Sequence, residues 1–426
     1  MKGISSTNRV VLLVLLSILL TACNSSGGKG TTDGAGNGGN NTITIKGSFS
    51  GGNHAGLFNN LFAWIFTSAH ALTQNDVSKV IVFRGDGGYG GYSVSSVTDG
   101  SFSIAAEKGS PVGLIFVGAS NNYLGYLTLS NGIDSIPLTK VTNGVTTIDL
   151  QTISSNGIVA TPGHNPIGAE LPFSSAEQAA IAQSNGMFAS TIRDPDVDGN
   201  GVIDMLENRF YRPWISYAVI AGNFGGAYTP TINSTVNIEA YNVAISSSLQ
   251  STSDSGGATV TGPIGSGITN ATCYEMNNSN QSVYMLYQNM APKTPSIPAA
   301  GEYTFTLNNG KVLSFLVPDQ SLASSKIVVA VPTVTLNSNG TINKISWVYR
   351  IPNDSSSTLT ATAVIDTIMI QINDTEGIRV YDSPWIASAT TEHLLTNQSI
   401  SWSNVNSMSM TYNDVYGTHI IVGFTK

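Results

Sequence analysis

The sequence predicts a mainly β protein, built as two antiparallel β-sandwich domains joined by a short helical segment that carries a calcium loop. Charged residues make up only 10% of the 426-residue chain. Its polarity comes instead from Ser, Thr, Asn and Gly, and the many β-branched residues favour strands over helices. Short apolar runs separated by Gly and Asn turns recur on both sides of the middle of the chain. Acidic residues are dense only in the middle itself.

The N-terminus has the organisation of an export signal. Lys2 and Arg9 form a positively charged region before an apolar run over residues 10–20, which is too short to span a membrane and suits a signal-peptide core. The run ends at Leu20-Thr21-Ala22-Cys23, which resembles the lipobox of bacterial lipoprotein signal peptides. The resemblance implies that residues 1–22 are removed, and that Cys23 carries diacylglycerol on its sulfur and an acyl chain such as palmitate on its new amine. An ordinary secretory signal with an incidental cysteine is the alternative.

Residues 23–41 follow as a flexible tether. They are rich in Gly, Ser and Asn and cannot bury a core, and random-coil scaling gives them a reach of roughly 20–25 Å. Asn24 stands where an Asp would favour inner-membrane retention of an enterobacterial lipoprotein. We therefore expect an exported protein that is anchored through its lipid at the bacterial outer membrane or the cell surface.

Residues 42–152 are predicted to form the first sandwich. Strand patterns fall at residues 42–49, 79–84, 92–98, 101–104, 112–117, 123–129 and 145–150. An uncharged apolar insertion at residues 54–72 interrupts them, and its large side chains recur at nearly helical spacing. This insertion is either a helix that closes one end of the sandwich or an exposed patch for a protein partner or a lipid surface.

The segments 80–83, 97–104 and 112–117 resemble carboxypeptidase-regulatory-like (transthyretin-like) domains. The hairpin Thr98-Asp99-Gly100-Ser101-Phe102-Ser103-Ile104 is the most recognisable part of this resemblance. It implies a non-catalytic sandwich of a kind found in many exported proteins.

Residues 153–222 are predicted to be a connector with short helices. Ser174 and Glu177 have the spacing of a capping box, so a helix should begin there and run to Gln183. Pro195 argues against a regular helix that enters the acidic stretch. A helix over residues 205–211 is expected to leave it and to stop at Pro213.

The acidic stretch, residues 196–207, matches the calcium-loop template D-x-[DN]-x-[DN]-G-x₅-E at every position. A hard cation needs about six to eight oxygen ligands, and such a loop supplies them from one short segment. The expected ligands are the side chains of Asp196, Asp198 and Asn200, the backbone carbonyl of Val202, Asp204 directly or through a water, and both carboxylate oxygens of Glu207.

This loop resembles the stand-alone EF-hand-type and dockerin-like calcium loops of exported bacterial proteins. Dockerins need two such loops, and this sequence has one. The resemblance implies a bound Ca²⁺, and the position between two β-rich halves favours a structural ion over a switch. A solvated acidic turn without a metal is the alternative.

Residues 223–426 are predicted to form the second sandwich. The Ser-, Gly- and Thr-rich residues 246–267 are expected to be a loop. Strand patterns fall at residues 235–241, 303–307, 312–317, 326–336, 342–351, 361–372, 378–381, 399–402, 408–412 and 419–424.

The sequence identifies no reaction. It contains no G-x-S-x-G, P-loop, H-E-x-x-H or C-x-x-C motif. Cys273 is expected to be a small buried side chain and not a reactive thiol. Trp385 and Trp402 are open to two interpretations, a sugar-binding face or, more often in such folds, the core. Asp366 could form a carboxylate pair with Asp374 or Glu376 only if folding brings them together.

The net negative charge argues against nucleic acid as a partner. The net charge of −8 becomes −10 once Lys2 and Arg9 are removed with the signal, and no basic stripe exists that would bind nucleic acid. We therefore expect a non-enzymatic, lipid-anchored envelope protein with a structural calcium site, which acts in scaffolding or in interaction with a protein or glycan partner. A carbohydrate-binding or polysaccharide-processing surface lipoprotein is the alternative.

Overall fold

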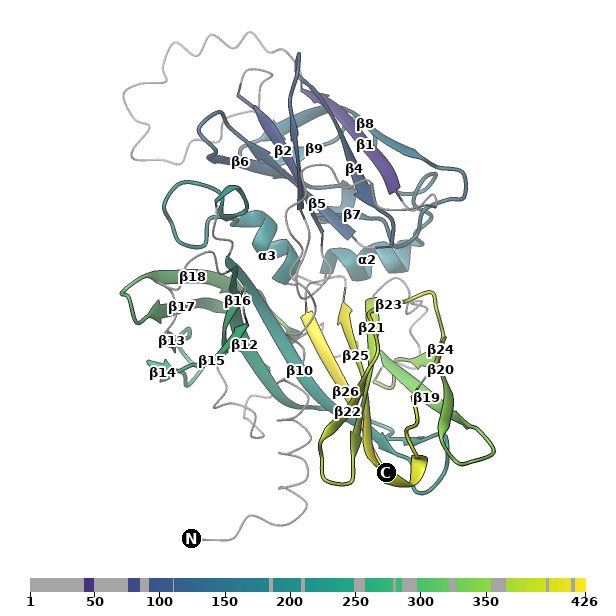
Figure 1. Ribbon diagram of the computed structural model, residues 1–426. Helices are drawn as coiled ribbons and strands as arrows, with labels where there is room; N and C mark the ends of the chain where they lie inside the picture. The colour runs from purple at the N-terminus through teal and green to yellow at the C-terminus, as the bar shows by residue number, and fades with distance from the viewer. Residues whose placement is uncertain are drawn as a thin grey trace.

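The computed structural model describes residues 42–49, 76–84, 92–109, 111–183, 187–207, 211–248, 257–278, 281–285, 297–321, 327–353, 365–395, 398–414 and 418–426. These residues form a mainly β protein with several sheets, as predicted (Figure 1). The expected signal peptide, Cys23, the tether and the apolar segment 54–72 lie outside them. Among the described residues, no helix has both the length and the apolar character needed to cross a membrane.

The first half of the chain forms one sheet, which has nine strands within the described residues. In sheet order these are β3 (Tyr92–Ser96), β2 (Lys79–Arg84), β5 (Pro111–Val117), β6 (Tyr123–Leu127), β9 (Val159–Thr161), β8 (Thr147–Asn156), β1 (Thr42–Phe49) and β4 (Ser101–Glu107), with β7 (Ile136–Pro137) beside β5. All seven strands predicted in this half are present; β1 and β2 have the predicted ends, and the ends of the other five are shifted.

The turn between β3 and β4 has the predicted two-residue form, closed by an isolated bridge between Thr98 and Ser101, and it connects the two ends of the strand order. Asp99 and Gly100 have positive φ angles of 48° and 70°, a backbone that a two-residue hairpin turn requires and that Asp and Gly tolerate. The Ser95 hydroxyl donates to the Ser103 carbonyl at 3.1 Å. The sheet therefore curls around its own core.

Side chains from alternate positions of the strands fill that core. Every second residue of β1 from Ile43 to Phe49 is buried, and β4 buries Phe102 and Ala106 in the same way. The rings of Phe49 and Phe116 meet edge-on with their centroids 5.3 Å apart.

The second half forms three sheets around one hydrophobic cluster, which includes Tyr217, Phe305 and Trp347. In the described residues the largest sheet has ten strands in the order β15 (Tyr274–Asn278), β16 (Gln281–Met285), β12 (Ile238–Ser248), β10 (Tyr211–Asn223), β26 (Thr418–Thr425), β25 (Val405–Asp414), β21 (Ile365–Asp374) and β22 (Arg379–Asp382), with β11 (Thr231–Ile232) beside β10 and β23 (Ile386–Ala387) beside β21. A second sheet has the order β14 (Ala271–Thr272), β13 (Ala258–Thr261), β17 (Gly301–Leu307) and β18 (Val312–Val317). The third consists of β19 (Val329–Leu336), β20 (Ile342–Arg350) and β24 (Glu392–Leu394).

The expectation of purely antiparallel sheets is wrong. β1 pairs with β8 in parallel, and so do β6 with β9 and β10 with β26. The partners in each pair are far apart in sequence, as parallel strands must be because they need a long crossover connection. The alternation within each strand predicts which residues are buried, but it does not predict the direction of the neighbouring strand.

Two local predictions in the second half are also wrong. Residues 399–402 do not form a strand; they lead into a 3-10 turn, η6 (Trp402–Asn404), with one isolated bridge between Thr341 and Ser401. β13 lies inside the predicted loop 246–267, and its Ala258 and Val260 both reach the core. The boundaries predicted at residues 152 and 222 fall within β8 and β10.

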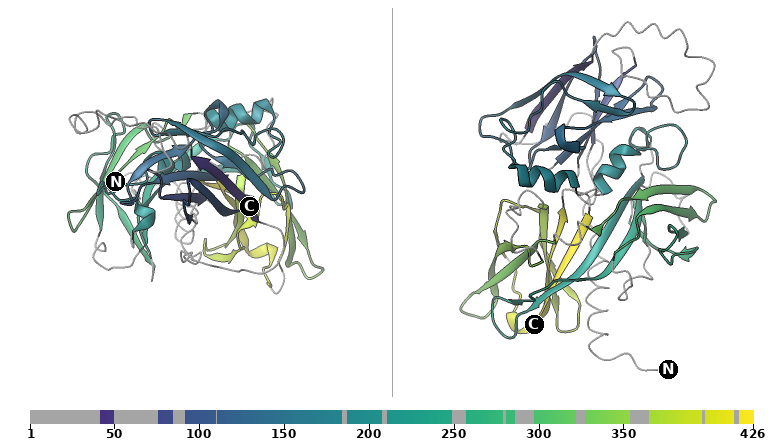
Figure 2. Two further views of the ribbon diagram at one scale, coloured as in Figure 1. Left: turned by 90° about the horizontal axis from the view of Figure 1, so that it is seen from above. Right: turned by 180° about the vertical axis from the view of Figure 1, so that it is seen from behind.

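Two short helices lie between the sheet of the first half and the sheets of the second (Figures 1 and 2). α2 (Ser175–Gln183) begins with the predicted capping box, because the Ser174 amide donates to Glu177 at 2.9 Å and the Glu177 amide donates to the Ser174 hydroxyl at 3.3 Å. α3 (Met187–Arg193) contradicts the expectation that no regular helix enters the acidic stretch. It ends at Arg193, so that Pro195 lies outside it.

The helix predicted over residues 205–211 does not appear in the described part of that range, residues 205–207 and 211. A 3-10 turn, η2 (Asp204–Leu206), forms at its start, and β10 begins at Tyr211. Pro213 therefore lies in a strand instead of stopping a helix. Its missing amide is tolerated because the pairing of β10 with β26 begins only at Ile215.

Candidate metal centre

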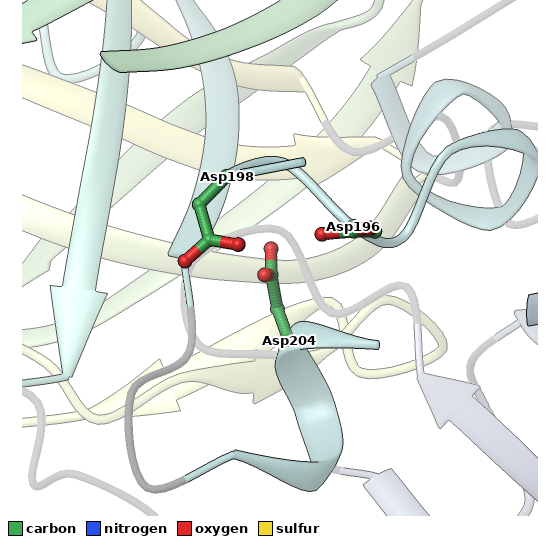
Figure 3. A group of neighbouring side chains, drawn as sticks. All are labelled: Asp196, Asp198 and Asp204. Carbon is green, nitrogen blue, oxygen red and sulfur yellow. The ribbon is translucent and has the colours of Figure 1, made fainter. Parts of the chain in front are cut away.

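Three carboxylates of the acidic loop meet at one point. Asp196, Asp198 and Asp204 each offer an oxygen within 4.8 Å of the others, and Figure 3 shows their side chains turned toward one another. Asp204 comes from η2, and the other two come from the segment that follows α3. The template spacing in the sequence thus corresponds to a real cluster of oxygens.

The backbone of the loop is shaped around the first of these carboxylates. The amides of Asn200 and Gly201 donate to the two oxygens of Asp196 at 3.1 and 2.8 Å. Gly199 and Gly201 have φ angles of 67° and 85°, in the left-handed region that glycine adopts without strain. Gly201, which stands at the sixth position of the calcium-loop template, therefore makes a sharp turn of the backbone.

Asp204 is the most unusual residue of the cluster. It has no exposed surface, and one of its carboxylate oxygens, Oδ2, accepts the Val197 amide at 3.0 Å. The other oxygen, Oδ1, is buried without a hydrogen-bond partner. Burial raises the pKa of this carboxyl to about 9, and the neighbouring Asp198 and Asp196 add to the shift. Asp204 therefore lies among other acidic groups, and its Oδ1 atom has no hydrogen-bond donor within the described residues.

One cation does reach the cluster, and it comes from a distant part of the chain. Lys311 Nζ lies 2.6 Å from Asp198 Oδ2, and the Asp198 side chain is only 3% exposed. The ammonium also lies over the Tyr211 ring, 4.5 Å from its centroid. Although burial lowers the pKa of Lys311, its hydrogen bonds to Asp198 and Tyr211 outweigh this effect and raise it.

The remaining predicted ligands lie beside the cluster but are paired with each other. The Asn200 amide group donates to both carboxylate oxygens of Glu207, at 3.0 and 3.1 Å, and its own oxygen accepts the Val202 amide at 2.8 Å. Glu207 is therefore held next to the three aspartates without belonging to their group.

The loop touches both halves of the protein. On one side, the Val197 carbonyl accepts the amide of Ser314 on β18 at 3.2 Å, and the Val197 side chain packs in the core of the second half. On the other, the Ile203 amide donates to the Asn121 carbonyl at 3.1 Å. Ile203 and Met205 pack against a second apolar face of the first-half sheet.

α3 makes the same double contact. The Tyr123 hydroxyl of the first half donates to the Ile192 carbonyl at 3.1 Å, and Arg193 pairs with Asp134 at 2.5 Å. Ser190 donates to the carbonyl of Leu316 on β18 at 2.6 Å. The helix and the acidic loop thus form one continuous junction between the two halves.

The donor set suits a hard divalent cation. Carboxylate and amide oxygens and a backbone carbonyl are the ligands that Ca²⁺ prefers, and no His or Cys side chain joins the three aspartates in the described residues. If a metal were bound, Asp196, Asp198 and Asp204 would hold it from the positions that they already occupy. Asn200, Glu207 and the Val202 carbonyl would complete the shell.

The other sequence candidates have structural roles. Burial raises the pKa of the Cys273 thiol to about 12, which makes it a poor nucleophile. Asp374 accepts the backbone amides of Glu376 and Ile378 and so caps the turn before β22. Trp402 is buried against Phe224.

Trp385 belongs to a different environment from Trp402. Its ring meets the His419 ring edge-on at 6.1 Å, and Trp214 meets the same histidine at 6.2 Å. Trp402 packs instead beside Phe224 and Tyr228. Among the described residues, the rings that contact Trp385 are therefore different from the rings that contact Trp402.

A row of polar residues that sequence reasoning missed crosses the ten-stranded sheet. The row follows the register of five adjacent strands through Asn242, Ser216, His419, Asn413 and Thr367. His419 Nδ1 lies 2.9 Å from the Asn413 amide oxygen. Burial lowers the pKa of His419 to about 4, so the ring is neutral near pH 7.

Comparisons with known proteins give no family for the chain. No protein-family model matches it, and no curated protein matches it. Among solved structures, the dimeric latent PorU from Porphyromonas gingivalis aligns at 11% identity and a TM-score of 0.14, over 82% of this chain and 30% of that one. The chain thus spans less than a third of the PorU chain, and a similarity of this size supports no conclusion about fold or function.

Proposed function

We propose that residues 196–207 bind one Ca²⁺ ion, and that this ion braces the junction between two β-sandwich domains. The observation that carries the proposal is the carboxylate of Asp204, which is fully buried beside Asp196 and Asp198 with one oxygen unpaired. A buried carboxylate without a counter-charge is strongly unfavourable. A divalent cation would supply both the charge and the bonds that Asp204 lacks.

The proposed brace acts through residues that do not bind the ion. Val197 follows the first ligand and Ile203 precedes Asp204, and these two contact opposite halves of the protein. An ion that fixes Asp196, Asp198 and Asp204 therefore also fixes the positions of both contact residues. A structural role follows from this geometry more directly than a catalytic one.

The expected energy is small, as befits a brace. Extracellular calcium modules bind with Kd on the order of 10⁻⁴–10⁻³ M. At millimolar calcium this stabilises the folded protein by roughly 0.4–1.4 kcal/mol. Such a contribution stiffens a junction between domains that already fold through their own cores.

The brace belongs, in this proposal, to a non-enzymatic lipoprotein of the bacterial envelope. The lipobox at Leu20-Thr21-Ala22-Cys23 supports the lipid anchor, and the hairpin of β3 and β4 supports a carboxypeptidase-regulatory-like first domain. The protein would hold the two domains at a fixed angle away from the membrane, for scaffolding or for interaction with a partner. Metabolic labelling with a palmitate analogue tests the anchor, and label that persists on Cys23→Ala would contradict it.

The calcium site is tested by titration and metal analysis of the purified chain. We expect one ion per chain, a Kd in the range of extracellular modules, and a higher melting temperature in calcium than in excess chelator. Protein without detectable calcium, whose melting curves are identical under the two conditions, would contradict the proposal.

A further inference from the structure

Lys311 is fixed in space by the turn that it follows. The turn joins β17 to β18, and within it the Leu307 amide donates to the Lys311 carbonyl at 2.8 Å, while the Lys311 amide donates to Asn309 Oδ1 at 2.9 Å. Gly310, with a φ angle of 84°, makes the reversal. The backbone of Lys311 is therefore held at both its amide and its carbonyl, by hydrogen bonds to Asn309 and Leu307.

The side chain of Lys311 is directed at the acidic loop. Its ammonium lies over the ring of Tyr211, which has no exposed surface, and ends 2.6 Å from Asp198 Oδ2. Only 26% of the lysine side chain is exposed, against 3% of the Asp198 side chain. This pair is more buried than an ordinary surface ion pair, whose contribution to stability is small.

The same aspartate is the third-position ligand of the proposed calcium loop. Asp198 therefore has two possible cationic partners, a tethered ammonium and a diffusible metal ion. The two cations repel each other, because both are positively charged and both would lie close to the same carboxylate. Without the ion, the ammonium neutralises part of a cluster to which Asp196, Asp198 and Asp204 all belong.

We propose that Lys311 is a tethered cation that holds Asp198 in place in the ion-free loop and lowers the affinity of the loop for Ca²⁺. The inference rests on the calcium site proposed above and adds the residue that sets its strength. Coulomb's law in a water-like dielectric makes the repulsion between an ammonium and a divalent ion about 6 Å apart worth about a tenfold change in Kd. Loss of the ammonium should therefore tighten calcium binding.

The proposal makes two predictions of opposite sign for one variant. Lys311→Met keeps an unbranched stem over Tyr211 and removes the charge. We expect its Kd for calcium, measured by calorimetric titration of the full chain, to be about tenfold lower than that of the wild type. In excess chelator, its melting temperature should be lower, because Asp198 then loses the ammonium of Lys311 as its cationic partner.

Two control variants and a second neutral variant separate the charge effect from other changes. Lys311→Arg keeps the positive charge, so its Kd should stay within about twofold of the wild type. Lys311→Gln repeats the neutral substitution with a polar end, in case the methionine variant folds poorly. Lys344→Met removes a lysine whose pair with Glu392, at 3.1 Å, lies on strands β20 and β24, and it should leave calcium binding unchanged.

The possible outcomes separate this inference from the proposed function. Wild-type protein that binds calcium, together with an equal or weaker affinity in both neutral variants, would overturn the role of Lys311 and leave the site intact. Absence of calcium binding in the wild type and in both neutral variants would contradict the site itself. A lower Kd for calcium in Lys311→Met and Lys311→Gln, and in neither control, supports both the calcium site and the role of Lys311.

Discussion

Val197 and Ile203 are six residues apart in one loop, yet their side chains pack in two different hydrophobic cores. Val197 lies in the core shared by the three sheets of the second half. Ile203 lies against Phe83 and Ile115 of the first-half sheet. The three aspartates that approach one another occupy the same segment as these two residues. An ion bound by the aspartates would therefore fix the loop segment that anchors Val197 in one core and Ile203 in the other.

Asp204→Asn should abolish calcium binding by the loop. The amide has nearly the same shape as the carboxyl group, which its raised pKa keeps uncharged near pH 7 in the ion-free protein, so we expect the ion-free variant to be about as stable as the wild type. The rise in melting temperature on addition of calcium should disappear. Thermal unfolding in calcium and in chelator measures both effects, and a calcium response that survives the substitution would exclude Asp204 as a ligand.

Ile203→Ala tests the contact between the loop and the first half. Ile203 has no exposed surface, and truncation of a buried isoleucine leaves a cavity that lowers the free energy of unfolding by about 2–5 kcal/mol. Urea unfolding measures the loss. Ile264→Ala is the matched control, because Ile264 is fully exposed and should change stability by less than about 0.5 kcal/mol. Equal stabilities for the two variants would mean that Ile203 does not pack as described.

Ser174→Ala tests the start of α2. The serine hydroxyl accepts the Glu177 amide, and its loss leaves that donor without its cap. We expect a loss of about 1 kcal/mol. Ser175→Ala lies one residue along the same helix and should have little effect. A larger loss in the Ser175 variant would contradict the placement of the cap.

The pH dependence of stability should contain a contribution from His419. Its pKa is near 6.5 in the unfolded chain and about 4 in the folded protein. Between these values the unfolded chain binds a proton that the folded chain does not, so the free energy of unfolding falls as the pH drops from about 6.5 to about 4. The contribution is complete above pH 6.5 and reaches at most about 3 kcal/mol.

The histidine contribution is isolated by comparison with His419→Gln. Denaturant unfolding of both proteins at a series of pH values gives the difference in their free energies of unfolding. This difference should change between pH 6.5 and pH 4 and stay constant from pH 7 to pH 8. A constant difference over the whole range would show that His419 is protonated as easily in the folded as in the unfolded chain.

The sequence predicts what is local in this protein. Period-two alternation located β1 and β4, the Ser174 and Glu177 pair located the start of α2, and template spacing located the aspartates. Each of these signals depends on residues that are neighbours along the chain. Local signals were misleading where two elements compete for the same residues, as at residues 205–211, where Tyr211 joins β10 because its strand partners outweigh a weak helical pattern.

The sequence could not predict the contacts that give the loop its surroundings. Lys311 and Ser314 reach the loop from a hairpin more than 100 residues further along the chain, and Asn121 reaches it from the first half. Nothing in the spacing of Lys311 marks it among the other lysines. The parallel pairing of β10 with β26 joins still more distant segments. Such pairings depend on the fold of the whole chain, which no short pattern contains.

The central claim, that a calcium ion braces the junction, is tested most directly by amide hydrogen exchange with and without calcium. Two amides report on the two sides of the loop: Ser314, which donates to Val197, and Ile203, which donates to Asn121. We predict that calcium slows exchange at both, and that the effect is absent in Asp204→Asn. Exchange at Ser314 and Ile203 that is the same in calcium and in chelator would contradict the account.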